Sequence, residues 1–208
     1  MAAQGTSGQT AAGRVNQKRR THLAIVRAAT DLIRTGREVT MPEVARTALV
    51  SEATAYRYFP DMASLLQEAM TDMVPSPDEV LAAIGDRADP VERVGAAAEF
   101  MLRHVLTLQG AIRAMIAATV AHPQGPARRP GLRFGVIDQA LAPVAGAVPA
   151  EAVARLKLGL SLVVSAEALF NLMDLAGLDP DAAVAAAADT ARTLTRAALA
   201  EAGSSGGA

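Results

Sequence analysis

The chain has 208 residues, of which 51% are hydrophobic and 20% charged, a composition typical of a globular protein with a large core rather than of a disordered chain. Its 20 basic and 21 acidic side chains give a net charge of -1, so the molecule as a whole is not a basic polyelectrolyte. It contains no cysteine, which excludes disulfides, thiolate metal sites and cysteine nucleophiles.

Both ends of the sequence are small and polar. Residues 1–17 lack the apolar stretch of a signal peptide and are expected to form a disordered arm, and residues 203–208 are expected to form a disordered tail. The longest apolar segment, 158–173, is interrupted by polar residues and is short for a membrane span. We therefore expect a cytoplasmic protein with no membrane partner.

Apolar residues at helical spacing predict a first helix that ends at Gly36, a natural C-terminal breaker. Its core-facing stripe consists of Ile25, Ala28, Ala29, Leu32 and Ile33. The basic run Lys18, Arg19 and Arg20 stands before this stripe. Such a run either contacts nucleic-acid phosphates or is only solvated, and the two interpretations carry equal weight here.

Two short helical patterns follow, separated by a tight turn. Thr40 and Ser51 are each placed to cap the N-terminus of one helix with a hydroxyl group, with Glu43 three residues after the first cap. The helical pattern is interrupted at Leu49 and Val50, which separate the two helices. This pattern predicts a helix-turn-helix.

The second helix of this pair is predicted to expose a short polar and aromatic face. Ala55 and Phe59 lie one turn apart and should point inward. The outward face then consists of Glu52, Ala53, Thr54, Arg57 and Tyr58, and Tyr56 is able to belong to either side. Small residues at the start of this helix allow close approach to a major groove, and its hydroxyl and guanidinium groups can bond phosphates and base edges.

The same window resembles the helix-turn-helix of the TetR family of transcriptional regulators, whose recognition helix runs V-S-x-x-T-x-Y-x-Y-F and precedes a Leu-containing helix. The matching residues are Val50, Ser51, Thr54, Tyr56, Tyr58, Phe59, Leu65 and Leu66. Three positions depart from the family pattern, since Leu49 replaces the turn glycine, Ala53 a small glycine and Met62 a phosphate-binding lysine. A left-handed backbone at Leu49 would cost about 1 kcal/mol or more, and no phosphate contact is carried over to Met62.

The resemblance and the exposed face together define the expected DNA-binding residues. These are Lys18, Arg19, Arg20, Thr40, Ser51, Glu52, Ala53, Thr54, Tyr56, Arg57 and Tyr58. The charge distribution supports this placement, because residues 1–60 carry nine basic and four acidic side chains and the remainder carries a net negative charge. The expected partner is a double-stranded DNA operator.

Beyond Leu66 the sequence is predicted to be helical nearly throughout, which indicates an all-α fold. The predicted helices cover residues 61–73, 78–84, 89–108, 109–121 after a kink at Gly110, 134–144, 149–176 and 179–202, with a loop over 122–130. We expect an N-terminal three-helix DNA-binding domain over residues 18–60 and a larger helical domain for effector binding and dimerisation over 61–202.

The last two long helices predict a homodimer. Residues 158–173 are apolar nearly all round, and the final helix carries small residues that let another helix approach closely. Packing of both helices against their symmetry copies as a four-helix bundle would bury these faces, a dimer mode that the resemblance also implies. The alternative is an intramolecular core without a dimer.

The resemblance further implies a dimeric repressor in which a small molecule bound in the C-terminal core moves helix four and releases the operator. Soft, polar and aromatic side chains within the apolar helices are the candidate ligand contacts, namely Met70, Phe100, Met101, His104, Arg113, Met115, Phe134, Glu167, Phe170 and Asn171. Each of them also has an ordinary explanation as a core or solvated residue. With no Trp and only two Tyr, aliphatic ligands are favoured over large flat aromatic ones.

Two other functions remain open at this stage. A regulator controlled without a ligand would share the DNA-binding features. An enzyme would need an unrecognised carboxylate site, for example around Glu99 and Glu167, because the three histidines are widely separated and no H-E-x-x-H or G-x-S-x-G motif is present. We expect no catalytic residues, no metal site and no cofactor.

Overall fold

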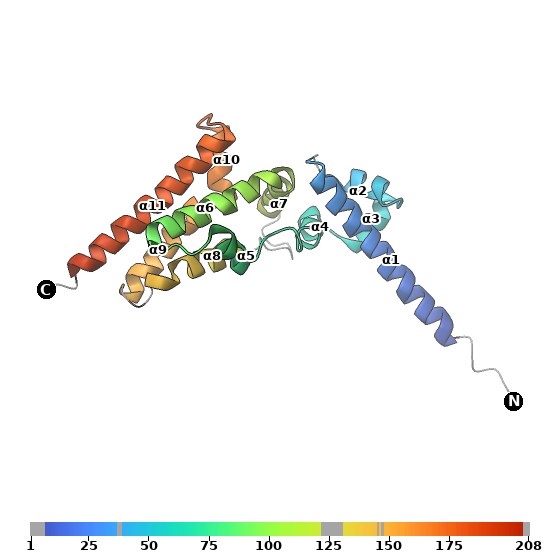
Figure 1. Cartoon of the computed structure of the whole chain (residues 1–208). Coiled ribbons are helices and arrows are strands. Elements are labelled where there is room, and N and C mark those ends of the chain that lie inside the picture. Colours follow the sequence, from blue (N-terminus) through green and yellow to red (C-terminus); the bar gives the residue numbers. More distant parts are fainter. Residues whose placement is uncertain (1–6, 37–38, 122–130, 145, 147, 206–208) are drawn as a thin grey trace. The chain divides into compact units, whose positions relative to one another are not determined.

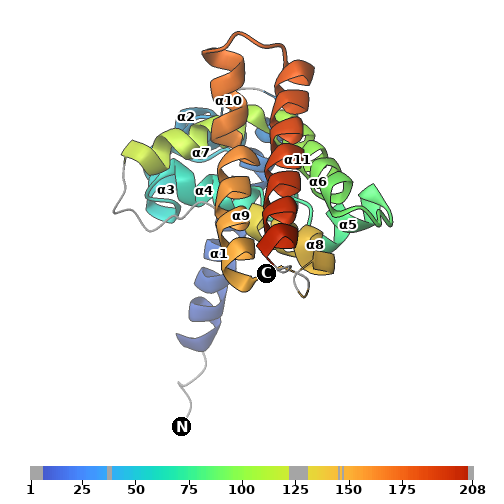
Figure 2. The same ribbon diagram turned by 90° about the vertical axis from the view of Figure 1, so that its left-hand side faces the viewer.

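The computed structural model describes residues 7–36, 39–121, 131–144, 146 and 148–205. Within these ranges the chain forms eleven α-helices and one short 3-10 helix, and no strand occurs in them (Figure 1). Figure 2 shows the same helices from a direction at right angles to the first. The prediction of an all-α fold is confirmed.

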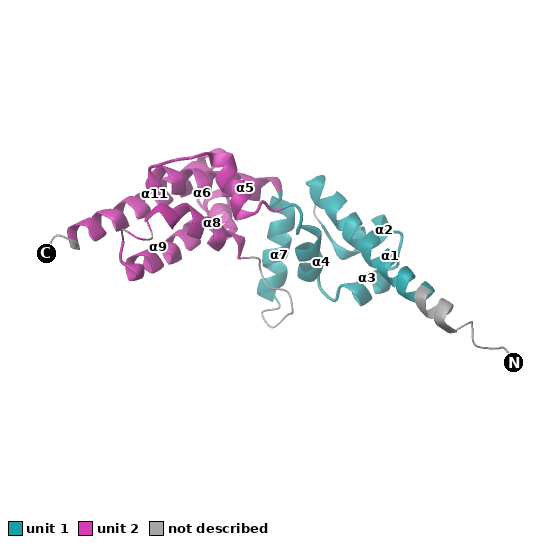
Figure 3. Ribbon diagram, turned by 60° about the horizontal axis from the view of Figure 1, so that its bottom comes forward, with its two compact units in different colours: residues 1–73, 108–129 teal, residues 74–107, 130–208 magenta. Residues whose placement is uncertain are grey.

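The described helices divide into two compact units (Figure 3). Unit 1 comprises Met1–Met73 and Leu108–Arg129, and unit 2 comprises Val74–Thr107 and Pro130–Ala208. The chain therefore leaves unit 1 after the first four helices and returns to it once.

Unit 1 is built around α1. Its helices are α1 (Ser7–Arg34), α2 (Met41–Thr47), α3 (Glu52–Tyr58), α4 (Met62–Ala69) and α7 (Gln109–Ala121). α1 packs on α2 and α4, α2 packs on α3, and α7 packs on α4. The predicted stripe of α1, including Ile25 and Ala29, is buried and supplies the centre of this core.

The two ends of the chain are more helical than the sequence predicted. α1 begins at Ser7, so the described part of the expected disordered arm, residues 7–17, is helical instead. α11 continues to Ser205, so residues 203–205 of the expected tail belong to its last turn. No proline separates either end from the apolar stripe of its helix, so the helix propagates through Gly8 and Gly13 in α1 and through Gly203 in α11. Residues 1–6 and 206–208 lie outside the described residues, as does the predicted loop over 122–130.

Helix α4 is shorter than predicted and belongs to unit 1. Asp61 caps it by accepting a hydrogen bond from the backbone N–H of Ser64 at 2.7 Å, and the helix ends at Ala69 rather than at Met73. Because α4 packs against both α1 and α7, the compact unit reaches beyond the boundary that we expected after residue 60.

Unit 2 is a helical bundle. Its elements are α5 (Pro77–Ile84), α6 (Pro90–Thr107), α8 (Leu132–Leu141), the 3-10 helix η1 (Ala142–Val144), α9 (Ala150–Val163), α10 (Ala166–Asp174) and α11 (Pro180–Ser205). α11 packs along α6 and α9, and α8 packs on α5, α6 and α9. Val94, Leu160 and Ala188 lie in the shared apolar core.

The long helix predicted over 149–176 is two helices with a 45° bend between them. The break lies at Val164 and Ser165, where Ser165 accepts a hydrogen bond from the backbone N–H of Ala168 at 3.0 Å and so caps α10. Its hydroxyl also donates to the carbonyl of Leu162 at 2.8 Å. Ser165, which the sequence analysis placed inside a helix, is thus an N-cap. Its hydroxyl bonds backbone groups that would otherwise take part in a continuous helix.

The predicted kink at Gly110 is a break at Leu108. α6 ends at Thr107 and α7 begins at Gln109, so Gly110 lies within the first turn of α7. The side chain of Leu108 is buried, and its carbonyl accepts from the N–H of Ile112 at 3.0 Å. The helix is therefore interrupted at the buried residue Leu108 and not at the flexible residue Gly110.

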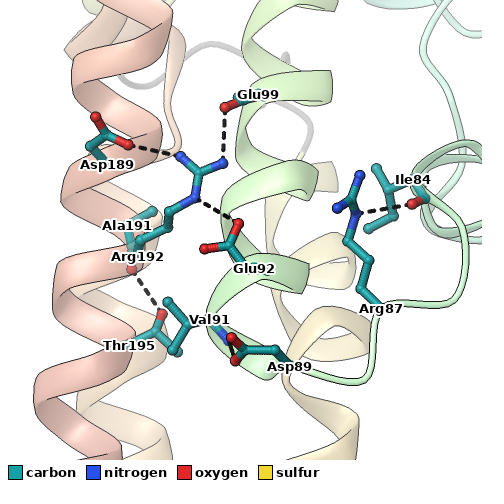
Figure 4. Close-up of polar contacts among 10 residues, drawn as sticks. All are labelled: Ile84, Arg87, Asp89, Val91, Glu92, Glu99, Asp189, Ala191, Arg192 and Thr195. Atoms are coloured by element: carbon teal, nitrogen blue, oxygen red, sulfur yellow. Dashed lines mark hydrogen bonds and ion pairs between the residues drawn. The ribbon is translucent and has the colours of Figure 1, made fainter.

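Arg192 links the two most extensively packed helices of unit 2. Its guanidinium lies between α11 and α6 and bonds Glu99 at 2.9 Å, Asp189 at 2.9 Å and Glu92 at 3.4 Å (Figure 4). Burial lowers the pKa of Arg192, but the hydrogen bonds and charges of these carboxylates outweigh it and the pKa is raised. The side chain therefore stays charged while only 18% exposed.

Among the described residues no single helix has the length and hydropathy needed to cross a membrane. Two bent pairs of consecutive helices, α6 with α7 and α9 with α10, have the length and hydropathy of a membrane span only when both helices of the pair are counted together.

Candidate nucleic-acid interface

The turn between α2 and α3 is closed by backbone hydrogen bonds. The N–H of Val50 donates to the carbonyl of Ala45 at 3.0 Å, and the N–H of Leu49 donates to the carbonyl of Arg46 at 3.3 Å. Leu49 has a φ angle of 56°, so it adopts the left-handed conformation in place of the glycine of the family pattern. Its side chain is 92% exposed and gains almost no packing in return.

The two predicted caps behave differently. Ser51 accepts a hydrogen bond from the backbone N–H of Thr54 at 3.2 Å, and its own hydroxyl donates to the Thr54 hydroxyl at 2.9 Å. Thr40 occupies the N-cap position of α2, but its side chain makes no capping hydrogen bond. The predicted side-chain cap by Thr40 is therefore wrong, and Glu43 instead pairs with Arg46 at 3.3 Å.

The outer face of α3 is open to solvent. Ala55 and Phe59 are buried in the core of unit 1, as their spacing predicted. Ser51, Glu52, Ala53, Tyr56 and Arg57 are exposed, and Thr54 and Tyr58 are half-buried. Tyr56, which the sequence left on either side, is 49% exposed. α3 therefore exposes a short, mostly polar face, while its opposite, apolar side is buried in the core.

A basic groove runs between the first half of α1 and the end of α3. It has a volume of about 420 Å³ and is lined by Arg14, Gln17, Lys18, Arg57 and Tyr58. None of these five side chains is acidic, and Arg57 lies 5.8 Å from the centre of the Tyr58 ring. Such a concentration of cations suits a backbone phosphate.

A second, shallower hollow of about 270 Å³ continues along α1. Its lining includes Lys18, Arg19, His22 and Tyr58, so it shares two residues with the basic groove. Arg20 is exposed on the same helix. The structure thus brings Lys18 and Arg19 together with Tyr58, a proximity that the sequence pattern did not predict.

Arg14 and Gln17 were absent from the predicted set of DNA-binding residues. They were overlooked because residues 1–17 were expected to be disordered, so their side chains had no predicted position. The signal that could have found Arg14 is its spacing, since residues four apart on a helix share a face and Lys18 follows Arg14 by four.

His22 fixes α1 against the helices around it. Its Nε2 atom lies 2.7 Å from Oε1 of Glu68 on α4, and its ring lies 4.8 Å from the centre of the Phe59 ring at the end of α3. The Tyr58 ring is 6.2 Å away. These contacts hold α1, α3 and α4 in one arrangement behind the exposed face of α3.

Comparison with known proteins agrees with this geometry. Residues 25–69 match the model of the family described as bacterial regulatory proteins, tetR family. The matched segment runs from the buried stripe of α1 to the last residue of α4 and so contains the whole helix-turn-helix. Residues 25–69 therefore form a TetR-family helix-turn-helix segment.

A solved structure supports the fold of the remaining chain. The crystal structure of a TetR transcriptional regulator from Rhodococcus sp. RHA1 is similar with a TM-score of 0.51 and 21% sequence identity, over 86% of this chain and 97% of that one. At this identity the likeness concerns the fold alone. A search of curated proteins found no match. The TetR-family helix-turn-helix makes this protein a DNA-binding transcriptional regulator.

The candidate effector contacts of this regulator are distributed over both units. Met70, Arg113 and Met115 belong to unit 1, and the other seven belong to unit 2. Four of the ten side chains are buried, namely Met70, Met101, Met115 and Phe170. Phe134 and Asn171 are exposed, and Phe100, His104, Arg113 and Glu167 are half-buried.

The placement of Met101 favours packing over ligand contact. It lies in the apolar core of unit 2 with Val94 and Ala97, and Phe100 packs against the same core. Neither of the two hollows along α1 is lined by any of the ten residues. Their role in this protein stays a prediction. Within the described part of the chain no group of three or more His, Asp or Glu side chains is arranged to hold a metal ion.

Proposed function

We propose that this protein is a dimeric repressor that acts in the cytoplasm, binds operator DNA through α3 of both subunits and is released by a small-molecule effector. The observation that carries the DNA-binding part is the exposed outer face of α3 beside the basic groove of α1. In this arrangement the recognition helix enters the major groove, and the cations of α1 contact the phosphates that flank it.

The predicted DNA contacts follow from this arrangement. The contacts on α3 and its N-cap are Ser51, Glu52, Ala53, Thr54, Tyr56, Arg57 and Tyr58. Thr40 faces the duplex from the N-cap of α2, and Lys18, Arg19 and Arg20 face it from α1. The test is selection of bound fragments from the source genome with the full-length protein, followed by measurement of affinity at two salt concentrations. Binding that is equally weak for all fragments would contradict an operator-specific regulator.

An exposed apolar face on α9 supports the dimer. Leu158 and Leu162 lie one helical turn apart and are 66% and 74% exposed. α9 and α10 lie alongside α11 (Figure 2). A pair of large apolar side chains open to water is typical of an interface. Symmetric pairing of two arms per subunit, the bent pair α9–α10 and the helix α11, would cover these side chains as a four-helix bundle. Sedimentation at micromolar concentration tests this, and a monomer would remove the inference.

Two recognition helices related by a two-fold axis enter successive major grooves when they lie about 34 Å apart. An effector that favours a different separation lowers operator affinity, because ligand and DNA then stabilise different conformations.

The contact of α7 with α4 supports this linkage, since α4 follows α3 directly and is held to α1 by His22 and Glu68. A displacement of α7 would be transmitted to the helix that supports the recognition helix. We propose an aliphatic effector, and the test is a panel of compounds screened by shifts in melting temperature and then by loss of operator binding. Operator binding that no stabilising compound reduces would favour the alternative of a ligand-independent regulator.

A further inference from the structure

One acidic side chain, Glu52, stands on the exposed face of α3. Phosphates repel a carboxylate, so an acid on a surface that meets DNA weakens binding unless it accepts a hydrogen bond from a base. The presence of Glu52 at this position therefore needs a physical reason.

The other acids near the helix-turn-helix are engaged within the protein. Asp61 accepts from the backbone of Ser64, Glu43 pairs with Arg46, and Glu68 contacts His22. Glu52, by contrast, makes no hydrogen bond or ion pair with any residue in the ranges that the structure describes. Its carboxylate is available to an external donor.

The position of Glu52 separates it from the cations of the interface. Arg57 and Tyr58 line the groove with Arg14, Gln17 and Lys18, so the end of α3 is turned toward α1. Glu52 and Tyr56 lie one helical turn apart on the other edge of α3. As the first residue of α3, Glu52 also occupies the end of a recognition helix that contacts base edges, whereas Arg57 is placed for the backbone.

The chemistry of the major groove then selects the base. Cytosine presents the N4 amino donor there, whereas guanine presents two acceptors and thymine presents an acceptor and a methyl group. A carboxylate accepts from cytosine and is repelled by the acceptors of guanine and thymine. Adenine presents a donor beside an acceptor and is bonded best by an amide.

We propose that Glu52 is a specificity-determining residue that selects a cytosine in each operator half-site. This inference depends on the proposed docking of α3 in the major groove. It extends that proposal by assigning base selection to Glu52 and backbone binding to Arg57 with the cations of α1.

A purely structural role for Glu52 makes a different prediction. Glu52 lies in the first turn of α3, where a carboxylate interacts favourably with the positive end of the helix dipole. If this were its whole role, its removal would lower the melting temperature and weaken binding to every sequence alike. The base preference would not move.

The experiment is selection of bound duplexes from a random double-stranded DNA library by full-length wild-type protein, E52Q, E52A and E52D. We expect the wild type to enrich one cytosine per half-site, E52Q to shift that position toward adenine, and E52A to lose its preference there, by roughly five- to tenfold in relative affinity. All other enriched positions should be unchanged. E52D keeps the charge at the helix end on a shorter side chain, so it should retain the melting temperature and weaken the preference.

The matched control is E43Q, which removes an acid from the first turn of α2 and should leave the enriched sequence intact. Identical enriched sequences for wild type, E52Q, E52A and E52D would overturn the proposal while leaving operator binding in place. A wild-type protein that enriches no sequence would overturn the proposed function itself, and with it this inference.

Discussion

The guanidinium of Arg192 on α11 lies against Gly95 on α6. A Cβ atom built at position 95 would overlap the Arg192 side chain, so glycine is what allows α11 to place this cation between Glu92 and Glu99. The cost is a glycine in the middle of an 18-residue helix, about 1 kcal/mol relative to alanine. The close approach of the two helices and the ion network are therefore one structural feature.

Substitution of Gly95 by alanine should reveal this coupling. In the wild type we expect G95A to lower the free energy of unfolding by about 1 kcal/mol, because the loss of the ion network outweighs the gain in helix propensity. In an R192A background the overlap is absent, and the same substitution should stabilise the protein by about 0.5–1 kcal/mol. Chemical denaturation of the four proteins of this cycle measures both values.

Gly159 on α9 supplies the control. A Cβ at this position would meet only the Leu194 side chain, at an ordinary contact distance of 3.7 Å. G159A should therefore stabilise the protein by up to about 1 kcal/mol. Equal effects of G95A in the wild-type and R192A backgrounds would mean that Arg192 does not require the glycine.

The turn of the helix-turn-helix contains a second feature with a measurable cost. Leu49 adopts a left-handed backbone that disfavours a side chain, and its side chain is almost fully exposed. L49G should raise the free energy of unfolding by roughly 0.5–1 kcal/mol, since relief of the strain exceeds the added freedom of the unfolded chain. Thermal and urea denaturation test this.

Alanine at position 49 separates the backbone effect from the loss of an apolar side chain. L49A removes the same exposed surface and keeps the strained backbone, so its stability should stay within about 0.5 kcal/mol of the wild type. A gain in L49A equal to that in L49G would show that exposure of the leucine, and not its φ angle, is the source of the cost.

The helix-turn-helix could be predicted from the sequence because its signals are local. Ser51 as a cap, the inward pair Ala55 and Phe59, and the break at Leu49 depend on residues within one or two turns of one another. The structure agrees at each of these positions. The same local reasoning failed at Thr40, whose hydroxyl is at the right position but makes no capping bond.

Features that depend on packing between distant segments could not be predicted. The groove that joins Arg14 and Lys18 to Arg57 forms only when α1 is helical and held against α3, partly through the contact of His22 with Phe59.

The break at Ser165 could not be predicted either, because a serine that caps a helix and a serine inside a helix have the same appearance in a single sequence.

The basic groove predicts how phosphate contacts depend on salt. R57A and K18A should each weaken binding to all DNA sequences by a similar factor and reduce the slope of log affinity against log salt by about 1. Fluorescence anisotropy with one selected duplex and one scrambled duplex, at several salt concentrations, measures both effects. R87A, which removes an exposed cation from unit 2, should change neither. A loss confined to the selected duplex would indicate instead that Arg57 contacts a base.

The exposed leucines of α9 predict the oligomeric state. L158E and L162E each place a carboxylate on the face that the proposed dimer would bury, where an unpaired charge costs several kcal/mol. We expect either variant to sediment as a monomer at micromolar concentration and to lose operator affinity, while the helical content is retained. V120E, which alters an exposed apolar residue of α7, should remain a dimer. An outward-facing glutamate hardly disturbs a monomer. If the L158E and L162E proteins stay dimeric and keep their operator affinity, the dimer interface does not include this face of α9.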